Sequence, residues 1–260
     1  GSELVGKTLG VVGLGAIGSL VAEMALTLGM DVVGYDPALS VEAAWRLSSQ
    51  VRKADTLSAL FARCDYISLH LPVLESTRGL VNSELLGAVR PGTCLVNFAR
   101  QEIVDESALL QALDGGKLRK YISDFPSPRL IGRDDVILTP HIGASTDEAE
   151  DNCAIMAAEQ LRDFLENGNI RNSVNFPALQ LERVTGCRLS VTNNNVPKIL
   201  GSVLAILADQ DINVIDMLNK SRDQIAYNLI DIDTHPAEAV LERMRELEGV
   251  INVRLIGDCG

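Results

Sequence analysis

The stretch TLGVVGLGAIGSLVAEMALTLGMDVVGYD at residues 8–36 contains a short apolar run, a glycine cluster, a helical segment closed by Gly29 and a second apolar run. This order predicts a strand, a helix and a second strand. Gly13, Gly15 and Gly18 form the pattern G-x-G-x-x-G where the first strand meets the helix. In that pattern the first glycine permits a turn, the second lets a pyrophosphate approach the backbone, and the third lets helix and strand pack closely.

The alternation of strands and helices continues along the chain. Apolar runs at 66–70, 93–97, 121–124 and 136–139 are separated by helical segments near 55–63, 83–86 and 105–114. This pattern predicts an α/β protein with a Rossmann-type, doubly wound parallel sheet over residues 1–145. A long helix is predicted at 145–167 and ends at Gly168. This helix and the linker after it form the region 146–183 between the two domains. Residues 184–260 then follow the order βαββαβ, which predicts a second, ferredoxin-like domain.

Composition restricts the possible partners. The formal charge is −12, from 35 acidic and 23 basic residues, so the field of the chain repels phosphate backbones and nucleic acid is not expected as a partner. No apolar run reaches the ~18 to 20 residues of a membrane span, and no membrane partner is expected. The five cysteines are scattered and never form C-x-x-C, which argues against a disulfide framework and a zinc site. Since no signal peptide opens the sequence, we expect a cytoplasmic protein.

Asp36 suggests which dinucleotide the glycine loop binds. It ends the second predicted strand, where a carboxylate can accept hydrogen bonds from both hydroxyls of an adenine ribose. A carboxylate there also repels a 2′-phosphate, and no Arg or Lys follows before Arg46. The sequence therefore predicts NAD as the cofactor, in preference to NADP. Ala16 and Ile17, between the glycines, are expected to line the same site.

Two further segments carry a family resemblance. LVNFARQEIVDESALLQAL around Arg100 and ILTPHIGASTDEAE around His141 resemble the D-isomer-specific 2-hydroxyacid dehydrogenases. The resemblance spans essentially the whole chain. The segments YISDF and ENGNIRNSVNFP and the C-terminal module are most similar to family members that oxidise 3-phosphoglycerate to 3-phosphohydroxypyruvate, the entry to serine synthesis. The family resemblance implies an NAD-dependent oxidoreductase with a small-molecule substrate.

Arg100 and His141 have side chains that suit the chemistry of such a reaction. Oxidation of a 2-hydroxy acid needs a base for the hydroxyl proton, and imidazole accepts a proton near neutral pH. A planar guanidinium can hold the substrate carboxylate with two hydrogen bonds. We therefore assign His141 as the base and Arg100 as the carboxylate ligand. Both follow predicted strands, at the carboxyl edge where open α/β sheets bind ligands.

The resemblance also implies further cofactor contacts. Asp124 matches the acceptor for the nicotinamide amide, and Phe98 and Ala99 match residues that line the ring. The remaining positions are Leu71, Pro72 and Thr77 on the adenosine side and Gly143 and Ala144 beside the nicotinamide.

The sequence departs from the family pattern in two places. The family orients its catalytic histidine with a glutamate shortly after the Asp124 position, but here the segment reads DFPSPR. Nothing there holds an imidazole as a carboxylate does: Ser127 is a weak substitute, and Asp134 and Asp135 are conceivable ones. The family also begins with a substrate-domain segment, whereas this sequence starts just before the first Rossmann strand. We therefore expect better NAD binding than turnover.

Residues 185–258 resemble an ACT domain, a small amino-acid-sensing module that pairs edge to edge. Asn193, Asn195 and Asn213 match the ligand positions of serine-inhibited relatives. Helix capping and turn formation are common roles of asparagine, so they are an equally weighted alternative to effector binding at these three positions. Because an exposed strand edge invites a partner strand, we expect a homodimer, or a homotetramer if the dinucleotide domains also pair.

Two alternatives stay open from the sequence. One is a non-catalytic NAD-binding and amino-acid-sensing oligomerisation protein, which the missing glutamate and missing N-terminal segment favour. The other is a reductase of another 2-keto acid, since fold analogy alone does not fix a substrate.

Overall fold

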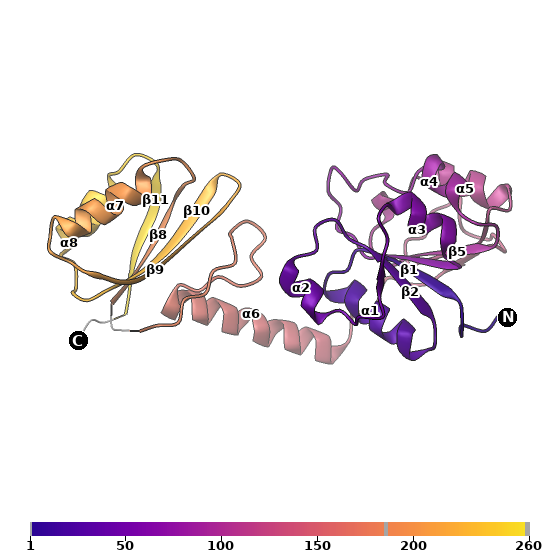
Figure 1. Cartoon of the computed structure of the whole chain (residues 1–260), viewed down its shortest axis with the longest axis horizontal. Coiled ribbons are helices and arrows are strands. Elements are labelled where there is room, and N and C mark those ends of the chain that lie inside the picture. The colour runs from indigo at the N-terminus through magenta and orange to yellow at the C-terminus, as the bar shows by residue number, and fades with distance from the viewer. Residues whose placement is uncertain (1, 185–186, 258–260) are drawn as a thin grey trace. The chain divides into compact units, whose positions relative to one another are not determined.

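The computed structural model describes residues 2–184 and 187–257 and divides the chain into two compact units, residues 1–143 and 144–260. The first unit contains a parallel sheet of seven strands in the order β3-β2-β1-β4-β5-β6-β7 (Figure 1). The strands are β1 (Thr8–Val12), β2 (Asp31–Tyr35), β3 (Arg52–Lys53), β4 (Tyr66–Leu69), β5 (Thr93–Asn97), β6 (Leu118–Ser123) and β7 (Val136–Leu138).

Helices cover both faces of this sheet because neighbouring strand residues point to opposite sides. Val11 packs toward α1, whereas Val12 belongs to the larger core on the other face. Figure 1 shows α1 on one face and α3, α4 and α5 on the other. The helices are α1 (Ala16–Thr27), α2 (Val41–Arg46), α3 (Leu57–Arg63), α4 (Ser83–Ala88) and α5 (Glu106–Asp114), with a 3-10 turn at Gln101–Ile103.

The chain reverses direction across the sheet between β1 and β4. From β1 it proceeds outward through β2 and β3, and from β4 it proceeds the other way to β7. Open α/β sheets bind ligands at such a switch point, beyond the carboxyl ends of the strands. The arrangement confirms the predicted doubly wound sheet and places the glycine loop, which follows β1, at this point.

The second unit begins with α6 (Asp147–Asn167), which Thr146 caps by accepting a hydrogen bond from the Ala149 N–H, and which Gly168 ends in the left-handed conformation. An antiparallel sheet follows, in the order β11-β8-β10-β9. Its elements are β8 (Cys187–Asn194), α7 (Ile199–Ala208), β9 (Val214–Arg222), β10 (Ile225–Ile232), α8 (Glu238–Arg245) and β11 (Val250–Ile256). This is the predicted βαββαβ order.

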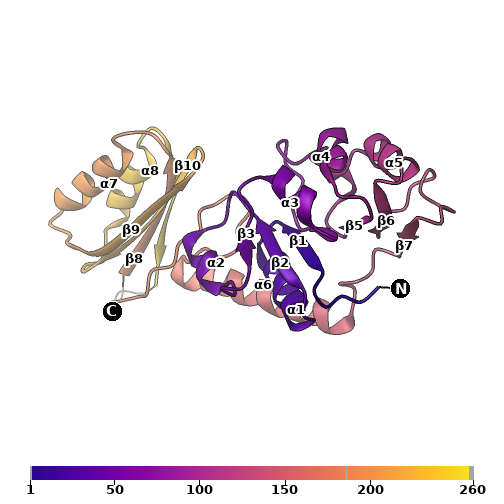
Figure 2. The ribbon, with the colours of Figure 1, turned by 45° about the vertical axis from the view of Figure 1, so that its right-hand side comes forward.

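Different segments pack on the two faces of the four-stranded sheet. Figure 2 shows α7 and α8 together on one face, over a core that contains Leu189, Leu207 and Met244. Tyr227 and Leu229 pack on the other face with residues from the segment that follows α6, including Ile170 and Leu179.

A buried arginine fastens that segment to the sheet. Arg188 on β8 is fully buried and pairs with the equally buried Asp231 on β10, with Nε–Oδ1 2.5 Å and Nη2–Oδ2 2.8 Å. Its other N–H groups donate to the carbonyls of Asn167, Leu181 and Glu182. All the donors of the guanidinium are therefore used, which is the condition for a buried charge to be tolerated.

The structure also bears on what composition indicated about membrane spans and cysteines. Among the described residues, no helix is long and apolar enough to cross a membrane. Cys64, Cys94 and Cys153 are free thiols, and burial raises the pKa of Cys64 to about 11. Cys187 is disulfide-bonded, a single bond that the scattered cysteine pattern did not predict. The spacing of cysteines along a chain does not report which of them meet in the fold.

Candidate active site

The glycine loop joins β1 to α1, and each glycine has a different environment. A Cβ at Gly13, whose φ is +92°, would lie 2.4 Å from the His70 carbonyl oxygen, and one at Gly18 would lie 1.9 Å from the Gly13 carbonyl oxygen. A Cβ at Gly15 would meet nothing within 4 Å. Gly13 and Gly18 are therefore needed for the turn itself, whereas the open space at Gly15 suits a ligand that approaches the backbone. Ala16 and Ile17 begin α1, and the Ile17 side chain is exposed.

Asp36 lies just beyond β2 and contacts the glycine loop directly. Its Oδ2 accepts from the Leu14 N–H at 2.8 Å and its Oδ1 accepts from the Ala38 N–H at 2.9 Å. Two bonds leave further lone pairs free, since an ionised carboxylate accepts about four. The carboxylate is thus held beside the loop with capacity for two ribose hydroxyls.

The segment after β4 closes the other side of the switch point. The His70 N–H donates to the Val12 carbonyl, and its Nε2 lies 2.9 Å from Ser68 Oγ. Burial lowers the pKa of His70, which favours a neutral imidazole. Leu71 and Pro72 follow, and the Thr77 hydroxyl donates to the Pro72 carbonyl at 2.6 Å while it accepts from the Leu74 N–H. Thr77 therefore shapes this turn.

Arg100 stands in a turn that a buried asparagine fixes. Asn97, the last residue of β5, is fully buried; it donates to the Arg100 carbonyl at 2.9 Å and accepts from the Ala99 N–H at 3.1 Å. The Arg100 side chain is exposed and donates one bond to the Ala99 carbonyl. Phe98 is also exposed. Asn97 is not among the residues predicted from the sequence, although an Asn at a strand end is a turn signal.

His141 is paired with Asp124. His141 Nδ1 lies 2.9 Å from Asp124 Oδ2, and the imidazole is 57% exposed whereas the carboxylate is 12% exposed. The Phe125 ring lies 4.9 Å from the imidazole, centroid to centroid. A carboxylate on Nδ1 fixes the tautomer and leaves Nε2 as the atom that can take a proton. Asp124 follows β6 and His141 follows β7, so two adjacent strands bring the pair together.

This pairing corrects the expectation that no nearby carboxylate holds the imidazole. Asp135 is engaged by Arg133, which lowers the pKa of Asp135, and the Asp134 carbonyl accepts from Lys120. Ser127 is buried and its hydroxyl has no partner. Asp124, assigned from the sequence to the cofactor alone, holds the imidazole instead. Gly143 and Ala144 lie in the exposed segment after β7, at the boundary of the two units.

The residues present suit a bound nicotinamide dinucleotide. Asp124 Oδ1 and Ser127 Oγ are buried and have no hydrogen-bond partner within the described part of the chain, which is costly unless a ligand or water supplies one. A carboxamide N–H₂ is a donor that could satisfy Asp124 Oδ1. Within the described ranges, no group of three or more His, Cys, Asp and Glu side chains is placed to hold a metal ion.

The three asparagines of the C-terminal unit do not meet within one chain. Asn193 is buried, and its Oδ1 accepts from Asn228 at 2.8 Å. Asn195 follows β8 and donates to the Asp223 carbonyl. Asn213 precedes β9 and hydrogen-bonds through its backbone to Asp233, at the end of the sheet where Val214 pairs with Ile232. The β8 end pairs Asn194 with Ile225, which is the opposite end.

The fold and this site define a dinucleotide-dependent oxidoreductase, and comparison with known proteins gives the family. Residues 1–143 match the model of the D-isomer specific 2-hydroxyacid dehydrogenase, NAD binding domain. The chain therefore belongs to that family of NAD-dependent dehydrogenases, which confirms the resemblance and NAD as the cofactor.

Relatives of known name extend the match. The chain is 36% identical over 266 residues to D-3-phosphoglycerate dehydrogenase of Haemophilus influenzae, covering 98% of this chain and 64% of the relative. It is 34% identical over 268 residues to the Escherichia coli enzyme of that name, with the same coverages. The chain thus spans less than two thirds of these curated relatives.

Solved structures show the same likeness. The NAD⁺-bound 3-phosphoglycerate dehydrogenase of Entamoeba histolytica has a TM-score of 0.59 and 34% identity, covering 67% of this chain and 57% of the other. A glyoxylate reductase from Paecilomyes thermophila has a TM-score of 0.60 and 30% identity, covering 67% of this chain and 54% of the other.

Proposed function

We propose that the chain acts as a D-3-phosphoglycerate dehydrogenase, which oxidises 3-phosphoglycerate to 3-phosphohydroxypyruvate with NAD in serine biosynthesis. The observation that carries the proposal is the Asp124–His141 pair, which follows adjacent strands on the carboxyl edge of the sheet that also bears Arg100 and the glycine loop. The names of the similar curated enzymes support the choice of substrate.

Each residue has a defined task in this reaction. Arg100 binds the substrate carboxylate, since its side chain is exposed and only one bond to its own turn is made. His141 takes the hydroxyl proton on Nε2, because Nδ1 is engaged by Asp124. Asp124 stabilises the imidazolium that forms. When bound, NAD accepts the hydride from C2 of the substrate.

The C-terminal unit extends the proposal to regulation. We assign it as an ACT-type module that takes serine as effector at a contact between two copies. Asn195 and Asn213 lie at opposite ends of the sheet in one chain, so one serine can contact both only if a second copy is present. Asn193 is internally bonded and positions the loop before Asn195.

A titration followed by turnover tests the enzyme. The chain is titrated with NADH, 3-phosphohydroxypyruvate is added, and NADH absorbance is followed; glyoxylate and hydroxypyruvate serve as comparison substrates. We expect tight NADH binding and turnover that Arg100→Gln and His141→Gln each reduce by at least about a hundredfold. Arg243→Gln, at an exposed arginine of the C-terminal unit, is the control and leaves turnover unchanged.

Each other outcome contradicts a stated part of the proposal. NADH binding without turnover contradicts the assignment of catalysis to this chain. Faster turnover of an unphosphorylated keto acid contradicts the substrate, and absence of NADH binding contradicts the role of the glycine loop.

A further inference from the structure

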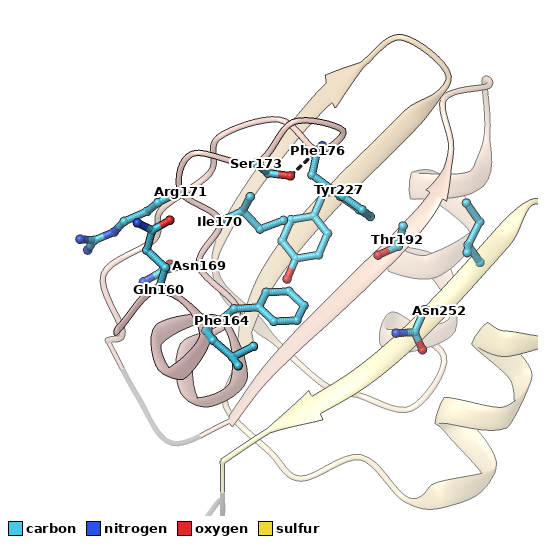
Figure 3. A pocket seen from close by; sticks show the side chains of 12 residues that line it. Gln160, Phe164, Asn169, Ile170, Arg171, Ser173, Phe176, Thr192, Tyr227 and Asn252 are labelled. Atoms are coloured by element: carbon cyan, nitrogen blue, oxygen red, sulfur yellow. Dashed lines mark hydrogen bonds between the residues drawn. The ribbon is translucent and has the colours of Figure 1, made fainter. Parts of the chain in front are cut away.

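A cavity of about 480 Å³ lies in the second unit, on the face of the four-stranded sheet opposite α7 and α8. Its lining comes from three places: Phe164 on α6, Ile170 and Phe176 on the following segment, and Thr192, Tyr227 and Asn252 on the sheet. Figure 3 shows the hydroxyl end of Tyr227 directed toward the Phe164 ring, with Thr192 and Asn252 on the neighbouring strands. We call this space the α6 cavity. Its volume is within the range of small-molecule sites, roughly 300–1,000 Å³.

The walls of the α6 cavity are held by hydrogen bonds. The Tyr227 hydroxyl donates to the Gly168 carbonyl at 2.7 Å, which fixes the end of α6 against β10. The Phe176 N–H donates to Ser173 Oγ at 3.1 Å (Figure 3), and the Arg222 guanidinium donates to the Ser173 carbonyl. Because these bonds order the segment, the cavity is preformed, and a ligand would lose little affinity to ordering it.

Aromatic groups set the first requirement on a ligand. Phe164, Phe176 and Tyr227 contribute three rings, and the Phe176 and Tyr227 rings already meet edge to face at 6.0 Å between centroids. Ile170 adds aliphatic surface. Aromatic pairs gain about 0.5–1.5 kcal/mol beyond the area that they bury, so a planar apolar group is favoured here.

Charge sets the second requirement. The chain carries a formal charge of −12, yet no acidic residue is among the described side chains that line the cavity, and Arg171 is among them. In Figure 3 the Arg171 guanidinium lies at the outer end, away from Phe164 and Tyr227. Its Nε lies 3.3 Å from Asp163 and its side chain is half exposed. A second cation lies beside the lining: the Cζ atom of Arg254 is 4.8 Å from the centroid of the Phe164 ring.

From these requirements we propose that the α6 cavity binds a small aromatic carboxylate. The ring lies between Phe164, Phe176 and Tyr227, and the carboxylate points to the Arg171 end. The Thr192 hydroxyl and the Asn252 amide supply neutral hydrogen-bonding groups at the floor. This site is distinct from the dehydrogenase site and from the asparagines assigned to serine, so the proposal stands independently of both.

Chemical-shift mapping on the full chain, labelled with ¹⁵N, tests this site. Phenylacetate is the probe, with benzyl alcohol as a neutral analogue and phenethylamine as a cationic one. We expect phenylacetate to shift the amides of Thr192, Tyr227 and Asn252, benzyl alcohol to bind more weakly, and phenethylamine to leave these amides unmoved.

Two variants separate the contributions of space and charge. Asn252→Phe fills the cavity and weakens phenylacetate binding by about tenfold or more, whereas Glu242→Phe, at an exposed position of α8 on the other face, has no effect. Arg171→Gln weakens phenylacetate by up to about fivefold, the range of an exposed ion pair, and leaves benzyl alcohol unchanged.

The proposal is overturned if phenylacetate leaves the three amides unmoved, if phenethylamine shifts them equally, or if Asn252→Phe binds as the unmodified chain does. A shift of the Asn252 amide, on the strand farthest from β9, with protein concentration alone and in the absence of ligand also overturns it, because another copy would then occupy the cavity.

Discussion

Gly15 and Gly18 belong to one loop, yet their surroundings predict different effects of substitution by alanine. At Gly18 the substitution should lower stability, and at Gly15 it should weaken NADH binding. In Gly18→Ala the new Cβ would lie 1.9 Å from the Gly13 carbonyl, so the loop must shift; we expect a loss of about 1–3 kcal/mol in stability. In Gly15→Ala the Cβ enters open space, so stability changes by less than about 0.5 kcal/mol, but the pyrophosphate is displaced and NADH binds about tenfold more weakly.

Urea unfolding and NADH titration of both variants distinguish these effects. Gly87→Ala on α4 is the matched control for binding, because its Cβ also meets nothing within 4 Å; it should leave NADH affinity unchanged and, since it lies within a helix, raise stability by about 0.5–1 kcal/mol. Equal losses of NADH affinity in Gly87→Ala and Gly15→Ala would contradict a cofactor role of the loop.

A second prediction concerns the tautomer of the His141 imidazole, which its contact with Asp124 sets. The carboxylate accepts from His141 Nδ1 at 2.9 Å, whereas the amide of Asp124→Asn can donate to the same nitrogen and hold the proton on Nε2. We expect ¹⁵N shifts of the His141 ring to report Nδ1–H in the unmodified chain and Nε2–H in the variant, with turnover reduced about a hundredfold. Asp134→Asn, an exposed neighbour, is the control; an unchanged tautomer in Asp124→Asn would contradict the pairing.

The sequence predicts Arg100, His141 and Asp124 as members of this site, but it does not predict the contact between Asp124 and His141. Arg100, His141 and Asp124 could be assigned from motif position, because strand ends of a parallel sheet converge on one edge. Which carboxylate reaches Nδ1 depends on the relative placement of β6 and β7, and local sequence does not encode that. Asp134 and Asp135 are nearer to His141 along the chain, yet Asp124 makes the contact.

At the scale of elements, the Arg188–Asp231 pair joins β8, β10 and the segment after α6. Removing one partner leaves a buried charge uncompensated, so Arg188→Met should lower the free energy of unfolding of the C-terminal unit by about 3–5 kcal/mol. The double variant Arg188→Met, Asp231→Leu should recover much of the loss, because no buried charge remains.

Hydrogen exchange of β8 and β10 amides measures this stability for the C-terminal unit separately. Arg243→Met is the control, because its pair with Asp209 is about half exposed on both sides and should cost less than about 1 kcal/mol. A loss in Arg188→Met as small as in Arg243→Met would show that the buried pair does not fasten the segment.

The elements themselves were predicted where they bury an apolar pattern. β5 has the expected bounds, 93–97, since its apolar run ends at a turn residue. The apolar pattern of the sequence does not predict α2 or β3. β3 consists of two exposed residues, Arg52 and Lys53, which have no apolar period; the strand exists because its backbone pairs with Val33 and Gly34. Pairing with a neighbour is a tertiary effect that a local pattern does not show.

At the scale of the whole molecule, β9 is an edge strand whose side chains are mostly exposed. An unpaired edge is a template for another strand, and antiparallel pairing of two β9 strands across a two-fold axis brings Asn213 of one copy toward Asn195 of the other. We expect self-association through β9, and serine should raise the dimer fraction if, as proposed, it contacts both asparagines.

Sedimentation velocity with and without serine measures this coupling. Asn213→Ala should abolish the response to serine and leave association without serine unchanged, because in the proposed site the Asn213 side chain contacts serine, whereas the strand pairing is made by backbone. Since the effector adds contacts only in the dimer, the shift in the association constant equals its differential affinity for the two states. A monomer that stays monomeric at saturating serine, or an Asn213→Ala variant that still responds, would contradict a shared site and leave the asparagines with capping and turn roles.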